Sequence, residues 1–194
     1  MKDRRLQFGE WMFRKRDYTP IPLILVALVF IKPTLLSVAV GAVSVVFGEA
    51  IRFWGVSYIG GISRTRSRST GSLMDSGPFS LVRNPLYVGN FFLSLGFVII
   101  SGVWFMVPVY VFFFGLQYHY IVLWEEWNLR AKFGAPYEEY CGRVPRWVPR
   151  LSGYRAGEHD FGKALRSERN TLGAIVAVSV VLAAGYFYLG SHPG

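Results

Sequence analysis

Cysteine is almost absent from this sequence, because Cys141 is the only one among 194 residues. A single cysteine excludes an intramolecular disulfide and a cysteine-based zinc cluster. We accordingly expect no metal site, and we do not expect this thiol to serve as a catalytic nucleophile.

Charged residues are also scarce. They make up 17% of the chain, against about a quarter in soluble domains, while hydrophobic residues make up 52%. The mean hydropathy is +0.32. These values together indicate an integral membrane protein.

Acidic residues are outnumbered, and the resulting net charge of +9 would by itself fit a nucleic-acid-binding protein. The lysines and arginines, however, avoid the apolar runs and gather in residues 2–16, 64–83 and 130–169. Segments of this kind are typical of cytoplasmic loops beside anionic lipid. We therefore predict the lipid bilayer as a partner and no nucleic acid, and the sequence indicates no oligomeric state.

Two apolar runs near the amino terminus are separated by Lys32 and Pro33. The first, residues 21–31, is short, and the second, residues 34–59, is interrupted by two charged residues. Proline suits the first turn of a new helix and lysine suits a surface turn, so we predict a tight helical hairpin. The alternative is one kinked span, which would move the arginines of residues 63–72 outside, against the positive-inside rule.

Three further apolar runs predict spans, over residues 86–101, 103–124 and 171–190. The expected fold is an all-α polytopic membrane bundle of about five transmembrane helices with a cytoplasmic cofactor site. We expect a single integral-membrane domain over residues 1–194. It begins with a basic cytoplasmic segment (residues 1–19) and a four-helix membrane core (residues 20–124). A cytoplasmic cofactor-binding segment (residues 125–170) and a fifth transmembrane helix (residues 171–190) follow. If the amino terminus is cytoplasmic, every basic residue except Lys32 and Arg52 lies in the membrane-flanking cytoplasmic segments.

Two ionisable residues interrupt the second apolar run. Glu49 and Arg52 are three positions apart on one helix, so they share a face and can pair. Ionisable side chains inside a membrane span need a partner or a water-filled cavity. A functional polar site and an ion pair that only fixes helix packing are equally consistent with this pattern.

A second polar group follows the fourth span. His119 and Glu126 are seven positions apart and line one stripe of a helix, while Glu125 points about 100° away. Adjacent carboxylates at a membrane exit can bind hydroxyl or ammonium groups of a polar ligand, and a solvated helix end is the alternative. Downstream, Gly134 predicts a helix end and Pro136 the start of a short amphipathic helix.

Several of these stretches occur in a fixed order. GPFSLVRNPLYVGN (residues 77–90) is followed by a two-span hairpin, the pair EE and FGAPYEEYCGRVPRWVP (residues 133–149), and is preceded by GEAIRFWGVSYIGG (residues 48–61). The combination, over about residues 41–150, resembles the integral-membrane methyltransferases that include isoprenylcysteine carboxyl methyltransferases and phospholipid methyltransferases.

The resemblance implies S-adenosylmethionine as cofactor and methyl transfer to a hydrophobic lipid or isoprenoid acceptor embedded in the membrane. It assigns cofactor binding to seven positions of this chain, Arg83, Asn84, Pro85, Tyr87, Glu125, Glu126 and Tyr137. The catalytic candidates are Arg83, Asn84 and His119. Asn84 stands where the family has histidine, and an amide keeps hydrogen-bonding capacity but loses the titratable group.

Two other functions remain open at this point. The sterol reductases, which use NADPH, resemble this family near the carboxy-terminal arm, although this chain is small for their membrane core. The second alternative is a non-catalytic membrane adaptor with a decayed pocket. It is kept open because Asn84 replaces the histidine of the family. The expected location is the bacterial inner membrane.

Overall fold

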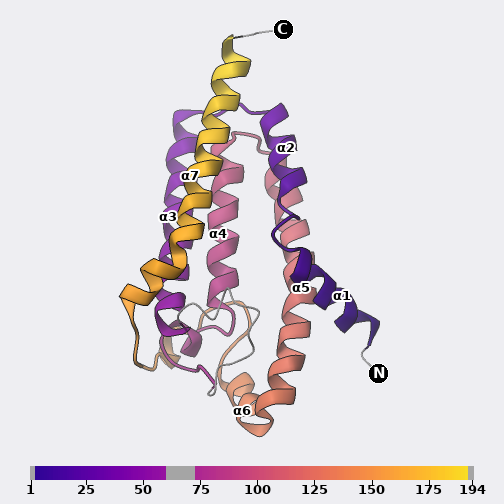
Figure 1. The fold of residues 1–194 in the computed structure, drawn as a ribbon, viewed down its shortest axis with the longest axis vertical. Helices are drawn as coiled ribbons and strands as arrows, with labels where there is room; N and C mark the ends of the chain where they lie inside the picture. The colour runs from indigo at the N-terminus through magenta and orange to yellow at the C-terminus, as the bar shows by residue number, and fades with distance from the viewer. Residues whose placement is uncertain (1–2, 60–72, 192–194) are drawn as a thin grey trace. The chain divides into compact units, whose positions relative to one another are not determined.

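The computed structural model describes residues 3–59 and 73–191, and every element in these ranges is helical (Figure 1). The helices are α1 (Arg4–Lys15), α2 (Ile21–Val29), α3 (Leu35–Ile59), the 3-10 turn η2 (Gly77–Ser80), α4 (Pro85–Ile100), α5 (Met106–Phe133), α6 (Ala135–Arg143), the 3-10 turn η3 (Leu151–Gly153) and α7 (Phe161–Ser191). The all-α prediction is confirmed. The arginine-rich tract of residues 63–72, expected as a cytoplasmic loop, lies outside the described residues.

Three of the described helices are long and apolar enough to cross a membrane. They are α3, α5 and residues Phe161–Tyr188 of α7. Helix α4 is also apolar but has only 16 residues, and α2 has nine. At 1.5 Å per residue α4 is about 24 Å long, which is less than the hydrocarbon thickness of about 30 Å. The expected count of five spans is therefore not confirmed. Helix α7 also begins ten positions earlier than the predicted fifth span.

Helices α2 and α3 are separated by a turn at the predicted position, Lys32-Pro33. Thr34 and Ser37 cap the new helix reciprocally, because the Ser37 amide donates to Thr34 Oγ1 at 3.1 Å and the Thr34 amide to Ser37 Oγ at 2.8 Å. The Lys32 amide donates to the Ser101 carbonyl at 2.9 Å, so this turn lies on the turn between α4 and α5. Figure 1 shows the chain reversing direction between α2 and α3, so these residues form two helices rather than one kinked span.

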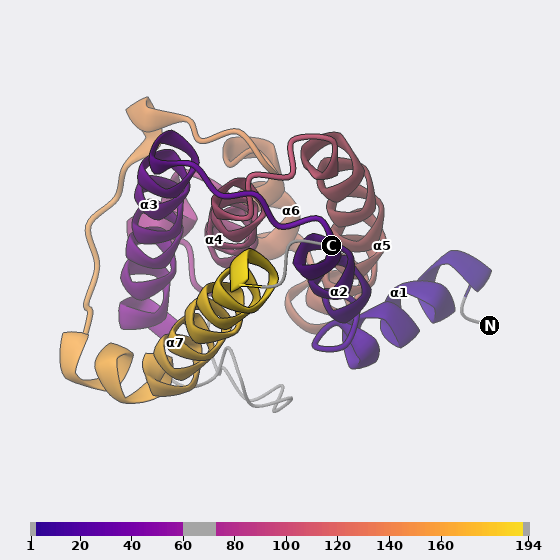
Figure 2. The ribbon, with the colours of Figure 1, turned by 90° about the horizontal axis from the view of Figure 1, so that it is seen from above.

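The chain forms two compact units. The first comprises Met1–Val46, Leu93–Asn128 and Ile175–Gly194, and the second comprises Phe47–Phe92 and Leu129–Ala174. In the first unit α2 lies beside α5, as Figures 1 and 2 both show, and Thr19 donates a hydrogen bond to Gln117 at 2.9 Å.

Glycines let α3 and α4 approach closely within each unit. In the first unit a Cβ added to Gly96 would lie 2.6 Å from the Gly41 carbonyl oxygen. In the second unit a Cβ on Gly89 would lie 2.7 Å from the Gly48 carbonyl oxygen. Small residues at helix contacts are typical of packing in membranes, where backbones must approach closely to gain van der Waals contact.

Candidate functional site

The polar stretch that precedes α4 is held by an irregular segment from the carboxy-terminal part of the second unit. The Gly77 amide donates to the Arg155 carbonyl at 2.7 Å, the Arg83 amide to the Pro145 carbonyl at 2.9 Å, and the Arg150 amide to the Leu81 carbonyl at 2.9 Å. These bonds satisfy main-chain groups of a segment that forms no sheet. We call residues 77–84 the motif loop and residues 145–155 the arm.

Two residues give the motif loop its tight start. Gly77 has φ +57°, a left-handed conformation that favours glycine. The Ser80 hydroxyl donates to the Gly77 carbonyl at 2.6 Å and accepts the Arg155 amide at 2.9 Å. The serine therefore closes the turn on itself and joins it to the arm.

Asn84 and Pro85 begin helix α4. The Asn84 carbonyl accepts the amides of Tyr87 and Val88 at 3.1 Å, so Asn84 stands at the helix start, where asparagine is preferred, and proline follows it at the first helical position. The Asn84 side chain donates from Nδ2 to the Arg146 carbonyl at 3.1 Å. Asn84 therefore links the motif loop to the arm as well as starting α4.

Replacing Asn84 with alanine should lower stability by about 1 kcal/mol, because the Arg146 carbonyl loses its side-chain donor and α4 loses a favourable first residue. The measurement is thermal unfolding in detergent, followed by circular dichroism. Asn84→His should recover much of the loss, since an imidazole N–H can replace the amide donor. An unchanged unfolding temperature for Asn84→Ala would show that the Arg146 contact is energetically unimportant.

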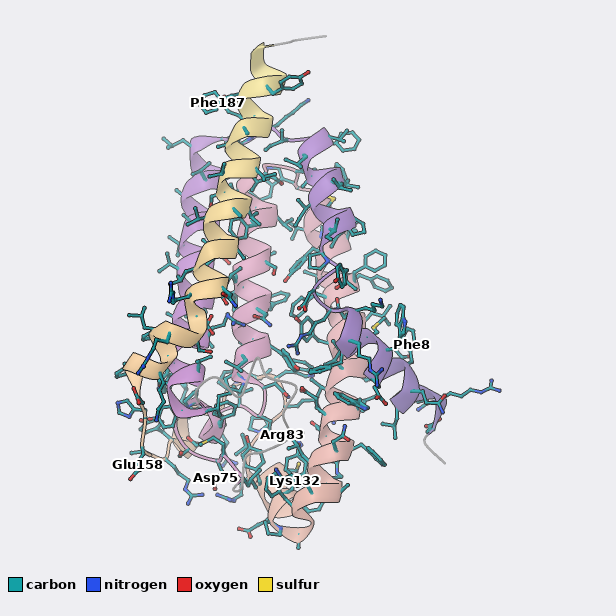
Figure 3. The ribbon with its side chains drawn as sticks, in the orientation of Figure 1. Phe8, Asp75, Arg83, Lys132, Glu158 and Phe187 are labelled. Atoms are coloured by element: carbon teal, nitrogen blue, oxygen red, sulfur yellow. The ribbon has the colours of Figure 1, made fainter. Side chains whose placement is uncertain are left out.

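The Arg83 side chain lies against α6. Its Nη1 donates to Cys141 Sγ at 2.6 Å, and the neighbouring Tyr140 hydroxyl donates to the Phe79 carbonyl at 2.8 Å. Tyr137 and Tyr140 are almost fully buried and form a cluster with Val144. Burial raises the pKa of Tyr140 well above its ordinary range, so its hydroxyl stays a donor. Figure 3 shows Arg83 and Asp75 among the loops of this unit.

Salt bridges connect the segment before the motif loop with the arm and with α6. Asp75 Oδ2 lies 2.6 Å from Arg155 Nη1 and 3.4 Å from Arg143 Nη2. All three side chains are partly exposed, so each pair contributes little stability by itself. They join the segment before the motif loop to α6 and to the arm.

The predicted site residues divide between the two units. Arg83, Asn84, Pro85, Tyr87 and Tyr137 belong to the second unit, whereas His119, Glu125 and Glu126 belong to the first. Pro85, Tyr87 and Tyr137 are buried, and Arg83 and Asn84 are half-buried.

The carboxylate pair on α5 lies in two different environments. Glu126 is only 2% exposed, whereas Glu125 is half-buried and His119 is exposed although it shares the Glu126 stripe. Beside them, Trp124 is 9% exposed, and its indole Nε1 is buried with no hydrogen-bond partner among the described residues. A buried N–H without an acceptor is costly, so this position suits a ligand oxygen.

The second unit also contains a buried ionic network that the sequence reveals only in part. The predicted pair is present, with Arg52 Nε 3.5 Å from Glu49 Oε2. Arg52 Nη2 also contacts both carboxylate oxygens of Glu168, at 3.0 and 3.1 Å, and the hydroxyl of Thr171 at 3.3 Å, while Nη1 donates to Asn90. Glu168 is fully buried. No sequence spacing joins positions 52 and 168, so pattern reasoning could not find this partner.

Possible metal ligands are not grouped in the described residues. Within residues 3–59 and 73–191 there is no cluster of three or more histidine, cysteine, aspartate or glutamate side chains that could hold a metal ion.

Curated relatives match part of this chain. It is 33% identical over 126 residues to the cobalt-zinc-cadmium resistance protein CzcN of Cupriavidus metallidurans, covering 65% of this chain and 54% of CzcN. It is 26% identical over 153 residues to the nickel-cobalt-cadmium resistance protein NccN of Alcaligenes xylosoxydans xylosoxydans, covering 79% of this chain and 68% of NccN. It is 31% identical over 128 residues to the protein-S-isoprenylcysteine O-methyltransferase of Rattus norvegicus, covering 61% of this chain and 43% of the enzyme.

The chain therefore spans about half the length of CzcN and of the isoprenylcysteine O-methyltransferase, and 68% of the length of NccN. No solved structure matches the chain at a significant level. The phospholipid methyltransferase family matches residues 36–136, just over half of the chain. This range contains α4, α5, the motif loop and all of α3 except its first residue. With helices long and apolar enough to cross a membrane, the chain is an integral membrane protein that belongs to the phospholipid methyltransferase family.

Proposed function

We propose that this protein is an S-adenosylmethionine-dependent methyltransferase whose acceptor is a membrane-embedded lipid or isoprenoid at the cytoplasmic surface of the bacterial inner membrane. The observation that carries the proposal is the motif loop, in which Arg83 and Asn84 are held beside α6 and the arm at the start of an apolar helix. Family membership and similarity to an isoprenylcysteine O-methyltransferase support it. A lipid acceptor stays in the bilayer while a polar cofactor comes from the cytosol, so the enzyme needs polar residues at the membrane edge.

The chemistry of the residues fits this cofactor. S-adenosylmethionine carries a carboxylate, an ammonium group, ribose hydroxyls and an aromatic base. The guanidinium of Arg83 suits the carboxylate, and the carboxylates of Glu125 and Glu126 suit the ammonium group or the hydroxyls. The buried Trp124 N–H, which has no acceptor among the described residues, is a further donor for a cofactor oxygen. We assign Pro85, Tyr87 and Tyr137 to cofactor binding as well.

When bound, S-adenosylmethionine supplies an electrophilic methyl group. The contribution of this chain is to hold and orient the reactants, because a methyl acceptor must approach in line at about 3 to 3.5 Å. We assign Arg83 and Asn84 to binding the cofactor through hydrogen bonds. An amide at position 84 can form such a bond without exchanging a proton. His119 is the candidate proton acceptor if the substrate must lose a proton, whereas an ionised carboxylate or thiolate needs none.

The test is calorimetric titration of the purified protein with S-adenosylmethionine and, separately, with NADPH. We expect binding of the first and none of the second. Methyl transfer is then followed with labelled cofactor and a panel of isoprenylated thiols, aminophospholipids and quinone precursors. Binding of NADPH alone would favour a reductase. Binding of neither ligand, by protein with its full helical content, would favour a non-catalytic adaptor.

Replacing Glu126 with alanine should weaken S-adenosylmethionine binding by roughly 5- to 150-fold, because loss of a buried carboxylate leaves its donors unsatisfied, at about 1 to 3 kcal/mol. Calorimetry measures the change. Glu139→Ala, on the exposed side of α6, removes the same charge and is the matched control. Unchanged affinity for Glu126→Ala would remove this residue from the binding site.

A further inference from the structure

One face of α1 attaches this helix to α5 within the first unit. Gly9 is buried, and a Cβ there would lie 2.2 Å from the Tyr120 carbonyl oxygen. The Phe13 ring lies 4.8 Å from the Trp124 ring, measured between centroids. The orientation of α1 about its own axis is therefore fixed by close packing, and this determines which residues point outward.

The outward face carries a regular stripe of four residues, Arg4, Phe8, Trp11 and Lys15. Their spacing of four, three and four positions places them in one line along the helix. All four are exposed, with Phe8 at 40% and Trp11 at 52%. The two rings stack at 5.8 Å with an interplanar angle of 16°. The Phe8 ring also meets the Tyr120 ring of α5 edge-on at 4.9 Å, so Phe8 lies at the border of the exposed face, and Figure 3 shows it projecting from α1. We call these four residues the α1 stripe.

The order of chemistry along the α1 stripe is cation, ring, ring, cation. Aromatic rings with an apolar body favour the boundary between lipid headgroups and acyl chains, and long basic side chains next to them reach the phosphate layer. Helix α1 is also followed within a few residues by the apolar helix α2, which begins at Ile21. The chain connection therefore keeps the stripe near the edge of the apolar layer.

A second copy of the chain is a poor occupant for this face. A two-fold contact would place the stripe of one copy against that of another. Because both ends of the stripe are positive, parallel and antiparallel pairing alike bring cation against cation. A negatively charged, partly apolar surface complements the stripe at every position.

We propose that the α1 stripe binds the anionic lipid surface of the membrane, with Phe8 and Trp11 inserted at the headgroup boundary and Arg4 and Lys15 paired with lipid phosphates. Helix α1 is then an interfacial anchor that selects anionic lipid. This proposal does not depend on methyl transfer, because it uses neither the motif loop nor the α5 carboxylates.

The experiment places a single fluorophore at position 8, through Phe8→Cys in a Cys141→Ala background, in the full-length protein. The protein is reconstituted in phosphatidylcholine vesicles that contain doxyl-labelled phosphatidylcholine or doxyl-labelled phosphatidylglycerol as quencher. A matched fluorophore at Val180→Cys reports on ordinary bilayer contact, since Val180 is 60% exposed on the apolar helix α7. Circular dichroism confirms that each variant keeps its helical content.

We expect both quenchers to act equally at position 180, and the phosphatidylglycerol quencher to act more strongly at position 8. Arg4→Gln with Lys15→Gln should reduce the preference at position 8 by about five-fold per removed cation. No quenching at position 8, or equal quenching by the two lipids, would overturn the proposal. Energy transfer between fluorophores on different copies would also overturn it, in favour of a second copy as the occupant.

Discussion

Replacing Glu168 with alanine should destabilise the protein by about 3 kcal/mol or more, because removal of one partner from a buried ion pair leaves a poorly compensated charge. Glu168 is fully buried and holds Arg52 Nη2 through both carboxylate oxygens. Arg52 is itself only 9% exposed and keeps Glu49 as a more distant carboxylate at 3.5 Å. The loss should appear as a lower unfolding temperature in detergent.

The control for this experiment is Glu139→Ala, which removes a carboxylate 3.7 Å from Arg143 on the exposed side of α6. Exposed ion pairs contribute little, so this variant should unfold like the parent. The double variant Arg52→Met with Glu168→Met removes both charges together. Its loss of stability should be smaller than the sum of the losses for Arg52→Met alone and Glu168→Met alone. Strict additivity would mean that the contact carries no coupling energy.

Replacing Gly77 with alanine should cost at least about 2 kcal/mol, because the new side chain meets two independent obstacles. The backbone has φ +57°, and the added Cβ would lie 2.3 Å from the Tyr58 ring. The Gly77 amide also donates to the Arg155 carbonyl, so any shift loosens the motif loop from the arm. We expect a lower unfolding temperature and faster proteolysis of the arm.

Gly142→Ala is the matched glycine variant. Gly142 lies in α6, and a Cβ there would have no heavy atom within 4 Å. Alanine is a better helix former than glycine, so this change should stabilise the protein by up to about 1 kcal/mol. A Gly77→Ala protein as stable as the parent would show that Tyr58 and the turn relax without cost.

Features that depend on a few neighbouring residues were predictable from the sequence. The helix end at Gly134 and the restart at Pro136 are present, since α5 ends at Phe133 and α6 spans Ala135–Arg143. The break at Lys32-Pro33 and the Glu49–Arg52 pair are present as well. Each follows from local rules for caps, proline and helical spacing, which hold without knowledge of distant parts of the chain.

Features of the candidate site that depend on distant segments were not predictable. Helical spacing placed His119 and Glu126 on one stripe, yet one is exposed and the other buried, because burial depends on what packs against each turn. The motif identified Asn84, but only the fold shows that its side chain holds the Arg146 carbonyl.

The sequence by itself determined the helical class, the membrane character and the order of motifs that marks the family, because composition and short-range spacing carry that information. Only the tertiary structure decided that Arg52 pairs with Glu168, a residue 116 positions away. It also decided that the arm pairs with the motif loop through main-chain hydrogen bonds. Residues of almost any type can form such bonds, so the sequence does not reveal them. Such contacts are fixed by packing between remote segments, for which no local pattern exists.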